Sequence, residues 1–182
     1  MQKIKMRRVI LYIAMSLDGY IADRDGGVAW LAGDGSEPEN AGSYPEFIET
    51  VDTVILGYRT YYQIVTELFK DSWVYSGKKS YVLTHKKIDS TDEIIFTDRN
   101  IRELMSQIMS EKGKDIWVCG GTDIANQFLE LGLIDRFCIT IIPTILGEGV
   151  RLFKNRRTEI PLQLLFTRSY NGMVDLCYEL RK

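Results

Sequence analysis

Two adjacent glycines, Gly120 and Gly121, stand where an apolar run ends and a helical pattern begins. The run 116–119 predicts a buried strand, and Thr122 opens the predicted helix. The first turn of a helix leaves backbone N–H groups without partners and carries partial positive charge, which suits a phosphate group. Because glycine has no side chain, a phosphate can approach the main chain there. A plain tight turn is the alternative, and the candidate phosphate ligands are Gly120, Gly121, Thr122 and Asp123.

Two further strand ends carry residues that suit phosphate. The apolar run 53–56 is followed by a glycine, a cation and a hydroxyl, namely Gly57, Arg59 and Thr60. The run 80–83 is followed by a hydroxyl, an imidazole and a cation, namely Thr84, His85 and Lys86. Three strand ends of this kind fit a dinucleotide with three phosphates, although each alone also fits a solvated turn.

Residues for other chemistries are scarce. His85 is the only histidine, and the GxSxG, HExxH and Walker A motifs are absent from the sequence. The three cysteines stand far apart in apolar stretches without CxxC spacing, at Cys119, Cys138 and Cys177. This spacing predicts buried free thiols, with neither a disulfide nor a metal site.

The composition limits the partners. The 182 residues are 45% hydrophobic, and 23 basic against 25 acidic groups leave a net charge of -2. This balance gives no reason to expect nucleic acid or an anionic membrane surface. No apolar run approaches the roughly 20 residues that span a bilayer. Asp18 and Asp23 come too early for a signal peptide, so we expect a cytoplasmic protein. A short basic cluster predicts a solvated N-terminal edge and consists of Lys3, Lys5, Arg7 and Arg8.

Strand and helix patterns alternate along most of the chain. Apolar runs predict strands at 9–15, 53–56, 80–83, 93–96, 116–119 and 136–143. Helical spacing predicts helices at 45–50, 60–69, 101–110 and 122–131. Asn171-Gly172 predicts a hairpin between 162–170 and 173–181. This order indicates an α/β fold, a mostly parallel mixed sheet with helices on its faces. Without a repeat or a linker, residues 1–182 form a single predicted domain.

Five segments together resemble the dihydrofolate reductase-like superfamily. They are AMSLDGYIA (14–22), VILGYRTY (54–61), YVLTHKK (81–87), VCGGTDIANQFLELGLID (118–135) and IIPTILGEGVRLF (141–153). In order and spacing they are similar to the branch that holds the reductase C-terminal domain of the bacterial riboflavin pathway. The resemblance implies a three-layer fold with helices on both faces of the sheet and a C-terminal antiparallel hairpin.

The resemblance also implies NADPH as the cofactor. The backbone at Ala14 and Ile21 would hold the nicotinamide carboxamide, and Ile124 would pack near the cofactor. Trp30 would close the loop over the nicotinamide, or simply anchor that loop in the core. The pyrophosphate would lie between Gly57, Arg59 and Thr60 on one side and Gly120, Gly121, Thr122 and Asp123 on the other. The 2′-phosphate would meet Thr84, His85 and Lys86.

One position departs from the family pattern. Arginine usually follows the glycine of the second strand directly, whereas Tyr58 stands here and Arg59 comes next. The contact between Arg59 and phosphate is therefore open, since the bidentate fork of arginine depends on its position. Tyr58 either stacks on adenine or packs on the surface.

The reaction expected is hydride transfer from NADPH to a small heterocyclic or carbonyl substrate. The proton donor is open, with Glu46, Thr140 and Asp18 as weak candidates. The alternative for Glu46 is an exposed charge at the start of a helix, and for Thr140 it is an ordinary strand residue. The alternative for Asp18 is a residue that shapes its loop. Val28 and Cys119 replace polar residues of the riboflavin-pathway pattern. Two alternatives stay open, a 5-amino-6-(5-phosphoribosylamino)uracil reductase proper and a non-catalytic NADPH-binding sensor.

A homodimer is the expected assembly. The segment 143–146 is apolar for a loop and adjoins the glycine-bearing segment 147–149. Apolar edges of sheets usually need a cover. The alternative is a loop tucked onto its own sheet.

Overall fold

The computed structural model describes residues 7–70 and 72–181. Its strands are β1 (Val9–Ser16), β2 (Tyr20–Ala22), β3 (Val51–Gly57), β4 (Lys79–Leu83), β5 (Ile94–Thr97), β6 (Asp115–Gly120), β7 (Arg136–Ile142), β8 (Val150–Arg151), β9 (Leu162–Tyr170) and β10 (Met173–Leu180). Its helices are α1 (Tyr44–Glu49), α2 (Tyr58–Gln63), which continues as a π-helical turn (Ile64–Leu68), α3 (Ile101–Ser110) and α4 (Thr122–Glu130). Among these, no helix is long and apolar enough to cross a membrane.

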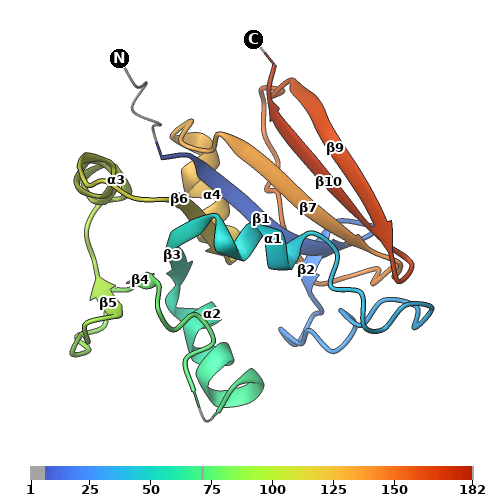
Figure 1. Cartoon of the computed structure of the whole chain (residues 1–182), viewed down its shortest axis with the longest axis horizontal. Helices are drawn as coiled ribbons and strands as arrows, with labels where there is room; N and C mark the ends of the chain where they lie inside the picture. The colour runs from blue at the N-terminus through green and yellow to red at the C-terminus, as the bar shows by residue number, and fades with distance from the viewer. Residues whose placement is uncertain (1–6, 71, 182) are drawn as a thin grey trace.

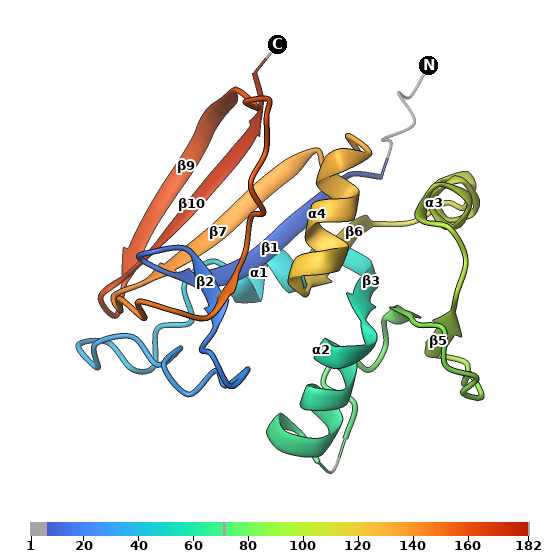
Figure 2. The same ribbon diagram turned by 180° about the vertical axis from the view of Figure 1, so that it is seen from behind.

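The main sheet has eight strands in the order β5-β4-β3-β6-β1-β7-β10-β9. All neighbours pair in parallel up to β7, and β10 and β9 then pair antiparallel. Helix α1 lies in front of the sheet in Figure 1, and α4 lies in front of it in Figure 2. The predicted mixed α/β sheet with helices on both faces is thus confirmed. A second sheet pairs β2 with β8, which the sequence patterns did not predict because both strands are very short.

The central strands are buried on both faces, as their continuous apolar runs predict. Leu11, Ile55 and Val118 pack on the side of α3 and α4. Tyr12, Leu56 and Trp117 pack on the side of α1. The sheet is therefore the rigid layer from which the strand-end loops project.

Local signals set the element ends. The side chain of Asn100 accepts a hydrogen bond of 2.8 Å from the Arg102 N–H, which caps α3 as predicted. Gly132, with a φ of +65°, follows α4. Asn171 and Gly172 have φ values of 44° and 70°, so the predicted hairpin turn joins β9 to β10.

The cysteine prediction is wrong for two of the three residues. Cys138 and Cys177 form a disulfide across β7 and β10, while Cys119 is free. The two are register partners on adjacent antiparallel strands, with 4.1 Å between their Cα atoms. The two cysteines are 39 residues apart in the sequence, and the pairing of β7 with β10 brings them together. Their spacing along the sequence therefore does not predict the disulfide.

The predicted solvated N-terminal edge is also wrong where the structure describes it. Arg7 is only 7% exposed and is bound by side chains and carbonyl groups of the β3 and β6 region. Arg8 binds the carboxylate of Asp115 at 2.6 Å. Lys3 and Lys5 lie outside the described residues. The two arginines therefore tie the start of β1 to its neighbours.

Candidate functional site

The sheet order places the three candidate strand ends side by side. Strand β3 lies between β6 and β4. Leu56 is the register partner of Gly120, and Gly57 is the register partner of Leu83. The turns after β6, β3 and β4 therefore open at the same edge of the sheet, where α/β folds bind ligands.

The turns after β3 and β6 approach each other so closely that side chains at their glycines would be crowded. A Cβ atom at Gly121 would lie 3.3 Å from Thr60 Oγ1, and one at Gly57 would lie 3.2 Å from Ile124 Cγ1. Gly120 has a φ of +126°, and its Cβ would lie 3.2 Å from Ile13 Cδ1. The conformation of Gly120 thus favours glycine, and the close approach of neighbouring atoms favours it at all three positions. A ligand at this end of the sheet would therefore contact backbone atoms of the glycine turns.

The side chains that open α4 are held by a neighbouring loop. Thr122 Oγ1 donates a 2.7 Å hydrogen bond to the Arg151 carbonyl, and Lys154 Nζ lies 2.6 Å from Asp123 Oδ1. These contacts direct both polar side chains toward the segment 151–154. An anion at the first turn of α4 would therefore be bound by backbone N–H groups.

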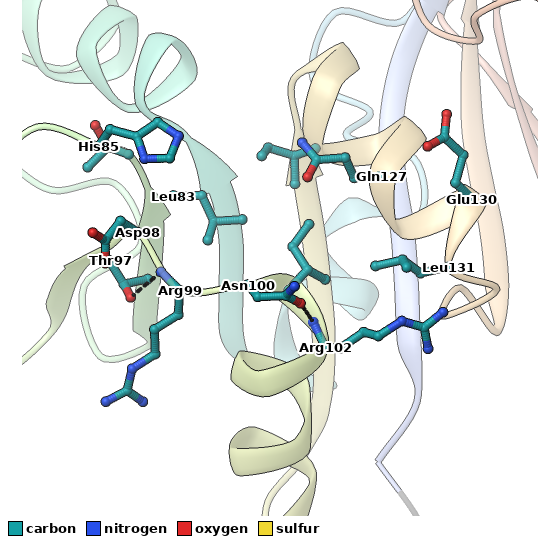
Figure 3. Close-up of a pocket in the computed structure, with 13 residues that line it drawn as sticks. Leu83, His85, Thr97, Asp98, Arg99, Asn100, Arg102, Gln127, Glu130 and Leu131 are labelled. Atoms are coloured by element: carbon teal, nitrogen blue, oxygen red, sulfur yellow. Dashed lines mark hydrogen bonds between the residues drawn. The ribbon is translucent and has the colours of Figure 1, made fainter.

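A cavity of about 500 Å³ continues from these turns. It lies between the ends of β4 and β5, the start of α3 and the side of α4 (Figure 3). Thr84, His85 and Ile124, all candidates from the sequence, line it. Sequence reasoning missed Thr97, Arg99, Asn100, Arg102 and Gln127. The sequence identified Asn100 only as a helix cap. The nearby cations Arg99 and Arg102 were the signal that could have indicated an anion site.

The β4 end is linked to the β3 end by a cation–π contact. Lys86 Nζ lies 4.1 Å from the centroid of the Tyr58 ring. Tyr58 also stacks on Tyr62, with 5.9 Å between ring centroids. Arg59 is exposed, and Tyr58 occupies the inner position of this turn. The Lys86 ammonium group and the neighbouring His85 imidazole therefore lie at one corner, beside an aromatic face that suits adenine.

The loop after β2 reaches across to α2. Gln63 Nε2 donates a 2.9 Å hydrogen bond to the Gly26 carbonyl. Trp30 is half-buried, and its Nε1–H donates to the Gly27 carbonyl at 3.2 Å. Ala14 is partly exposed near the end of β1, and Ile21 packs against the core on the α4 side. The loop thus lies over the same edge of the sheet as the glycine turns.

The carboxylate of Asp18 fastens the turn between β1 and β2 to the segment after β7. Its Oδ1 accepts a 2.6 Å bond from the Ser16 hydroxyl, and its Oδ2 accepts a 2.8 Å bond from the Gly147 N–H. The Ser16 hydroxyl, followed by the N–H groups of Gly147 and Leu146, lowers the pKa of Asp18 from 3.8 to about 2. These contacts agree with the loop-shaping role.

Asp18 should therefore stabilise the fold in a pH-dependent way. Its pKa is lower in the folded state, so its contribution is complete above about pH 4 and disappears as the pH falls toward 2. We expect Asp18→Asn to unfold at lower urea concentration than the wild type at pH 7, and the gap to close near pH 2. Urea midpoints across this range measure it, and a gap that is constant with pH would contradict it.

The other two proton-donor candidates have close partners. Glu46 is exposed and forms a bidentate pair with Arg168, with bonds of 3.0 and 3.1 Å. Thr140 is buried, and its hydroxyl donates a 2.6 Å bond to Asp175 Oδ1. Asp175, on β10, is a buried carboxylate that sequence reasoning did not consider. Asp175 is therefore the acidic residue that contacts the Thr140 hydroxyl directly.

Aromatic rings line the α1 side of the β6 end. Trp117 lies 4.9 Å from Tyr75 and 6.0 Å from Tyr44 between ring centroids. The Tyr75 hydroxyl lies 3.4 Å from the Cys119 sulfur. Burial raises the pKa of the Cys119 thiol to about 11, so it is uncharged at neutral pH. This wall therefore presents aromatic faces and a neutral thiol immediately before Gly120.

The chain has relatives among known proteins. The model of the RibD C-terminal domain matches residues 7–178. Uncharacterized protein YwjB of Bacillus subtilis (strain 168) is 39% identical over 175 residues, which cover 94% of this chain and 97% of YwjB. Uncharacterized protein YyaP of the same organism is 32% identical over 185 residues, covering 96% of each chain.

A solved structure supports the same relationship. A putative riboflavin biosynthesis protein from Shewanella sp. PV-4 matches with a TM-score of 0.84 at 25% identity. The match covers 96% of this chain and 99% of that one, so the two proteins share their architecture from end to end.

Proposed function

The chain belongs to the RibD C-terminal domain family, and we propose that it is an NADPH-dependent reductase that transfers a hydride to a small heterocyclic or carbonyl substrate. The riboflavin-pathway branch of the dihydrofolate reductase-like fold, predicted from the sequence, is confirmed by this membership and by the Shewanella structure. The family supports a reductase; the cofactor and the substrate class are the proposal.

The observation that carries the proposal is the junction of the two glycine turns. A Cβ at Gly121 would lie only 3.3 Å from Thr60 Oγ1, so two closely packed segments of bare main chain face one end of the sheet. Backbone N–H groups at the start of α4 suit a diphosphate, and the cavity lined by His85 and Arg99 suits an adenosine phosphate. A dinucleotide held this way would extend past Gly120 toward Ala14 on the neighbouring strand.

The residues present therefore fit NADPH. When bound, NADPH supplies the hydride. The chain would hold its diphosphate through the main chain at 120–123 and its 2′-phosphate through Thr84, His85 and Lys86. The loop that carries Trp30 would exclude water from the nicotinamide.

Turnover is the test of this function. We expect NADPH oxidation with at least one member of a panel of pterins, pyrimidines and aldehydes. Reduction of 5-amino-6-(5-phosphoribosylamino)uracil would identify a riboflavin-pathway enzyme. NADPH binding without oxidation by any member would contradict the reductase and favour the sensor.

The cluster at the β4 end should set the cofactor preference. We expect the double variant His85→Ala, Lys86→Ala to lose about tenfold or more in affinity for NADPH and little for NADH, because only NADPH has a 2′-phosphate. Calorimetric titration with both cofactors measures the ratio. Lys112→Ala, an exposed lysine beyond α3, is the control and should leave the ratio unchanged. An equal loss for both cofactors would place the 2′-phosphate elsewhere.

We propose a homodimer that forms through β9. This strand is one of the two edge strands of the main sheet (Figure 1), and its Leu164 and Phe166 side chains are 49% and 43% exposed. Apolar edge strands that remain uncovered promote pairing with another chain. We expect light scattering to give twice the chain mass of 20.9 kDa, and the double variant Leu164→Glu, Phe166→Glu to give a monomer. A wild-type mass of 20.9 kDa would reject the dimer.

A further inference from the structure

A second cavity, of about 620 Å³, lies at the edge strand β5, between β4, β5 and α3. We call it the β5 groove. Parallel strands are usually joined by a crossover that contains a helix. Residues 84–93 join β4 to β5 without a helix, so this connection leaves the face of the two strands beside α3 open. The β5 groove therefore results from the way the chain connects its two outermost parallel strands.

The β5 groove is distinct from the cavity between β4 and α4. The two share a wall at the ends of β4 and β5, formed by Thr84, His85, Thr97, Asp98 and Arg99. The other residues that line the β5 groove do not line the first cavity, and they come from the length of β4 and β5 and from α3. A ligand in the groove would therefore lie on the far side of this wall from the proposed adenosine site.

The floor of the β5 groove is apolar. Tyr81 and Leu104 line it and belong to the core on the α3 side, where they are 3% and 1% exposed. Ile95 is partly buried and packs against the same core. Ile88, on the connection between β4 and β5, is 37% exposed and adds an apolar flank. Sites for small molecules typically combine apolar walls of this kind with a few polar groups.

Two lysines border this floor. Lys79 Nζ lies 5.7 Å from the centroid of the Tyr81 ring, which places its ammonium group over the floor. Lys87 lines the groove from the connection between the strands. Among residues 7–70 and 72–181, neither lysine forms a salt bridge, not even with Asp89 or Asp98, the two carboxylates that line the groove. Both charges therefore favour the approach of an anion.

Arg99 brings a third cation to the β5 groove. Its Nη1–H donates a hydrogen bond to the side-chain oxygen of Gln107, which lines the groove but not the first cavity. In Figure 3 the Arg99 side chain extends away from Gln127, which lines the first cavity. Lys86 behaves differently, because its ammonium group lies over the Tyr58 ring at the β3 end. Arg99 therefore directs its charge into the groove, whereas Lys86 directs its charge toward the cofactor side.

The chemistry of the β5 groove defines its ligand. Lys79, Lys87 and Arg99 together suit a doubly charged anion, and the guanidinium fork matches the oxygens of a phosphate group. The apolar floor suits a flat ring, which would cover Tyr81 and Ile95. A phosphate without a ring would leave the floor in water, and a ring without charge would make no use of the cations.

We propose that the β5 groove is a second small-molecule site, which binds an aromatic phosphate ester and is separate from the cofactor cavity. The phosphate would contact Lys79, Lys87 and Arg99, and the ring would lie on the apolar floor. The proposal goes beyond the reductase function and does not depend on it, because Lys79, Lys87 and Tyr81 line this groove alone.

The probe that tests the site is 1-naphthyl phosphate, which joins a flat double ring to a phosphate. It is titrated by isothermal calorimetry into the full chain, once without cofactor and once with saturating NADPH. We expect one probe per chain in both titrations. We also expect the probe to bind about tenfold or more tightly than inorganic phosphate or 1-naphthol, because each of these lacks one half of the contacts.

Variants locate the bound probe. The double variant Lys79→Ala, Lys87→Ala should weaken probe binding about tenfold or more and keep the affinity for NADPH within about threefold. Lys79→Arg, Lys87→Arg should retain probe binding, since the charges remain. Arg102→Ala is the matched control, because Arg102 lines only the first cavity, and it should leave the affinity for the probe unchanged.

Three outcomes would overturn the proposal. Displacement of the probe by NADPH, or a loss in Arg102→Ala as large as that in the double alanine variant, would place the probe in the first cavity. Unchanged probe binding in the double alanine variant would show that the groove is not the site. Absence of probe binding at millimolar concentration would show that the cations are merely solvated. Failure of the reductase proposal is recognised separately, because NADPH would then not bind to the wild type, while the titration without cofactor still decides the groove.

Discussion

Gly121→Val is expected to lower the affinity for NADPH about 100-fold. A Cβ at this position lies 3.3 Å from Thr60 Oγ1 before any branching methyl is added. The valine side chain would therefore fill the space through which a diphosphate approaches the main chain. Loss of two charge-assisted hydrogen bonds at the lower end of about 1.5–3 kcal/mol each accounts for the size of the effect. Calorimetric titration with NADPH measures it.

Gly132→Ala is the control for this variant. Gly132 has a φ of +65° at the opposite end of the same helix, and a Cβ there would meet nothing within 4 Å. The change should cost about 1 kcal/mol of stability through backbone strain and leave the affinity for NADPH unchanged. Thermal melts of both variants ensure that only folded protein is compared. If Gly121→Val binds NADPH as well as the wild type, the diphosphate lies elsewhere.

Arg7→Met is expected to destabilise the fold by about 2–4 kcal/mol, because the buried guanidinium is the donor for several acceptors and a buried acceptor left without its partner costs about 1–3 kcal/mol. The guanidinium binds the carbonyls of Lys114 and Ile108 at 2.7 and 3.1 Å and Thr53 Oγ1 at 2.6 Å. It also forms an ion pair with Asp52. Methionine fills part of the volume but satisfies none of these acceptors. Urea unfolding followed by circular dichroism measures the loss.

An exposed arginine gives the matched comparison for Arg7. Arg24 pairs with Glu148 at 3.4 Å, and both side chains are about 70% exposed. Surface pairs contribute roughly 0–1 kcal/mol, so Arg24→Met should unfold close to the wild type. A loss for Arg7→Met that is no larger than that for Arg24→Met would show that the buried network does not stabilise the fold.

Much of the fold was predictable because its signals are local. The bounds of α3 follow from helical spacing and the Asn100 cap, and Asn171-Gly172 fixes the hairpin between β9 and β10. Burial on both faces gives β1 and β3 their uninterrupted apolar runs. Each of these features depends on residues within a few positions of one another, which is the range that sequence patterns describe.

The features that sequence reasoning missed depend on distant contacts. Asp175 meets Ser43 across 132 positions, and Arg7 meets Lys114 across 107. Arg99 and Arg102 reach the cavity only because α3 starts beside the ends of β4 and β5. The sequence shows that Arg99 and Arg102 lie near Asn100 but does not show that they reach a cavity, since strand order and helix placement create the surroundings of all these residues. The glycine turns were recognised because their chemistry lies in consecutive residues.

Titration of the wild-type protein with NADPH by isothermal calorimetry tests the central claim, that bare main chain at the ends of β3 and β6 holds a dinucleotide diphosphate. We predict one NADPH per chain with a dissociation constant on the order of micromolar, as is typical of sites that use about −8 kcal/mol of binding free energy. No binding heat up to millimolar NADPH would contradict it.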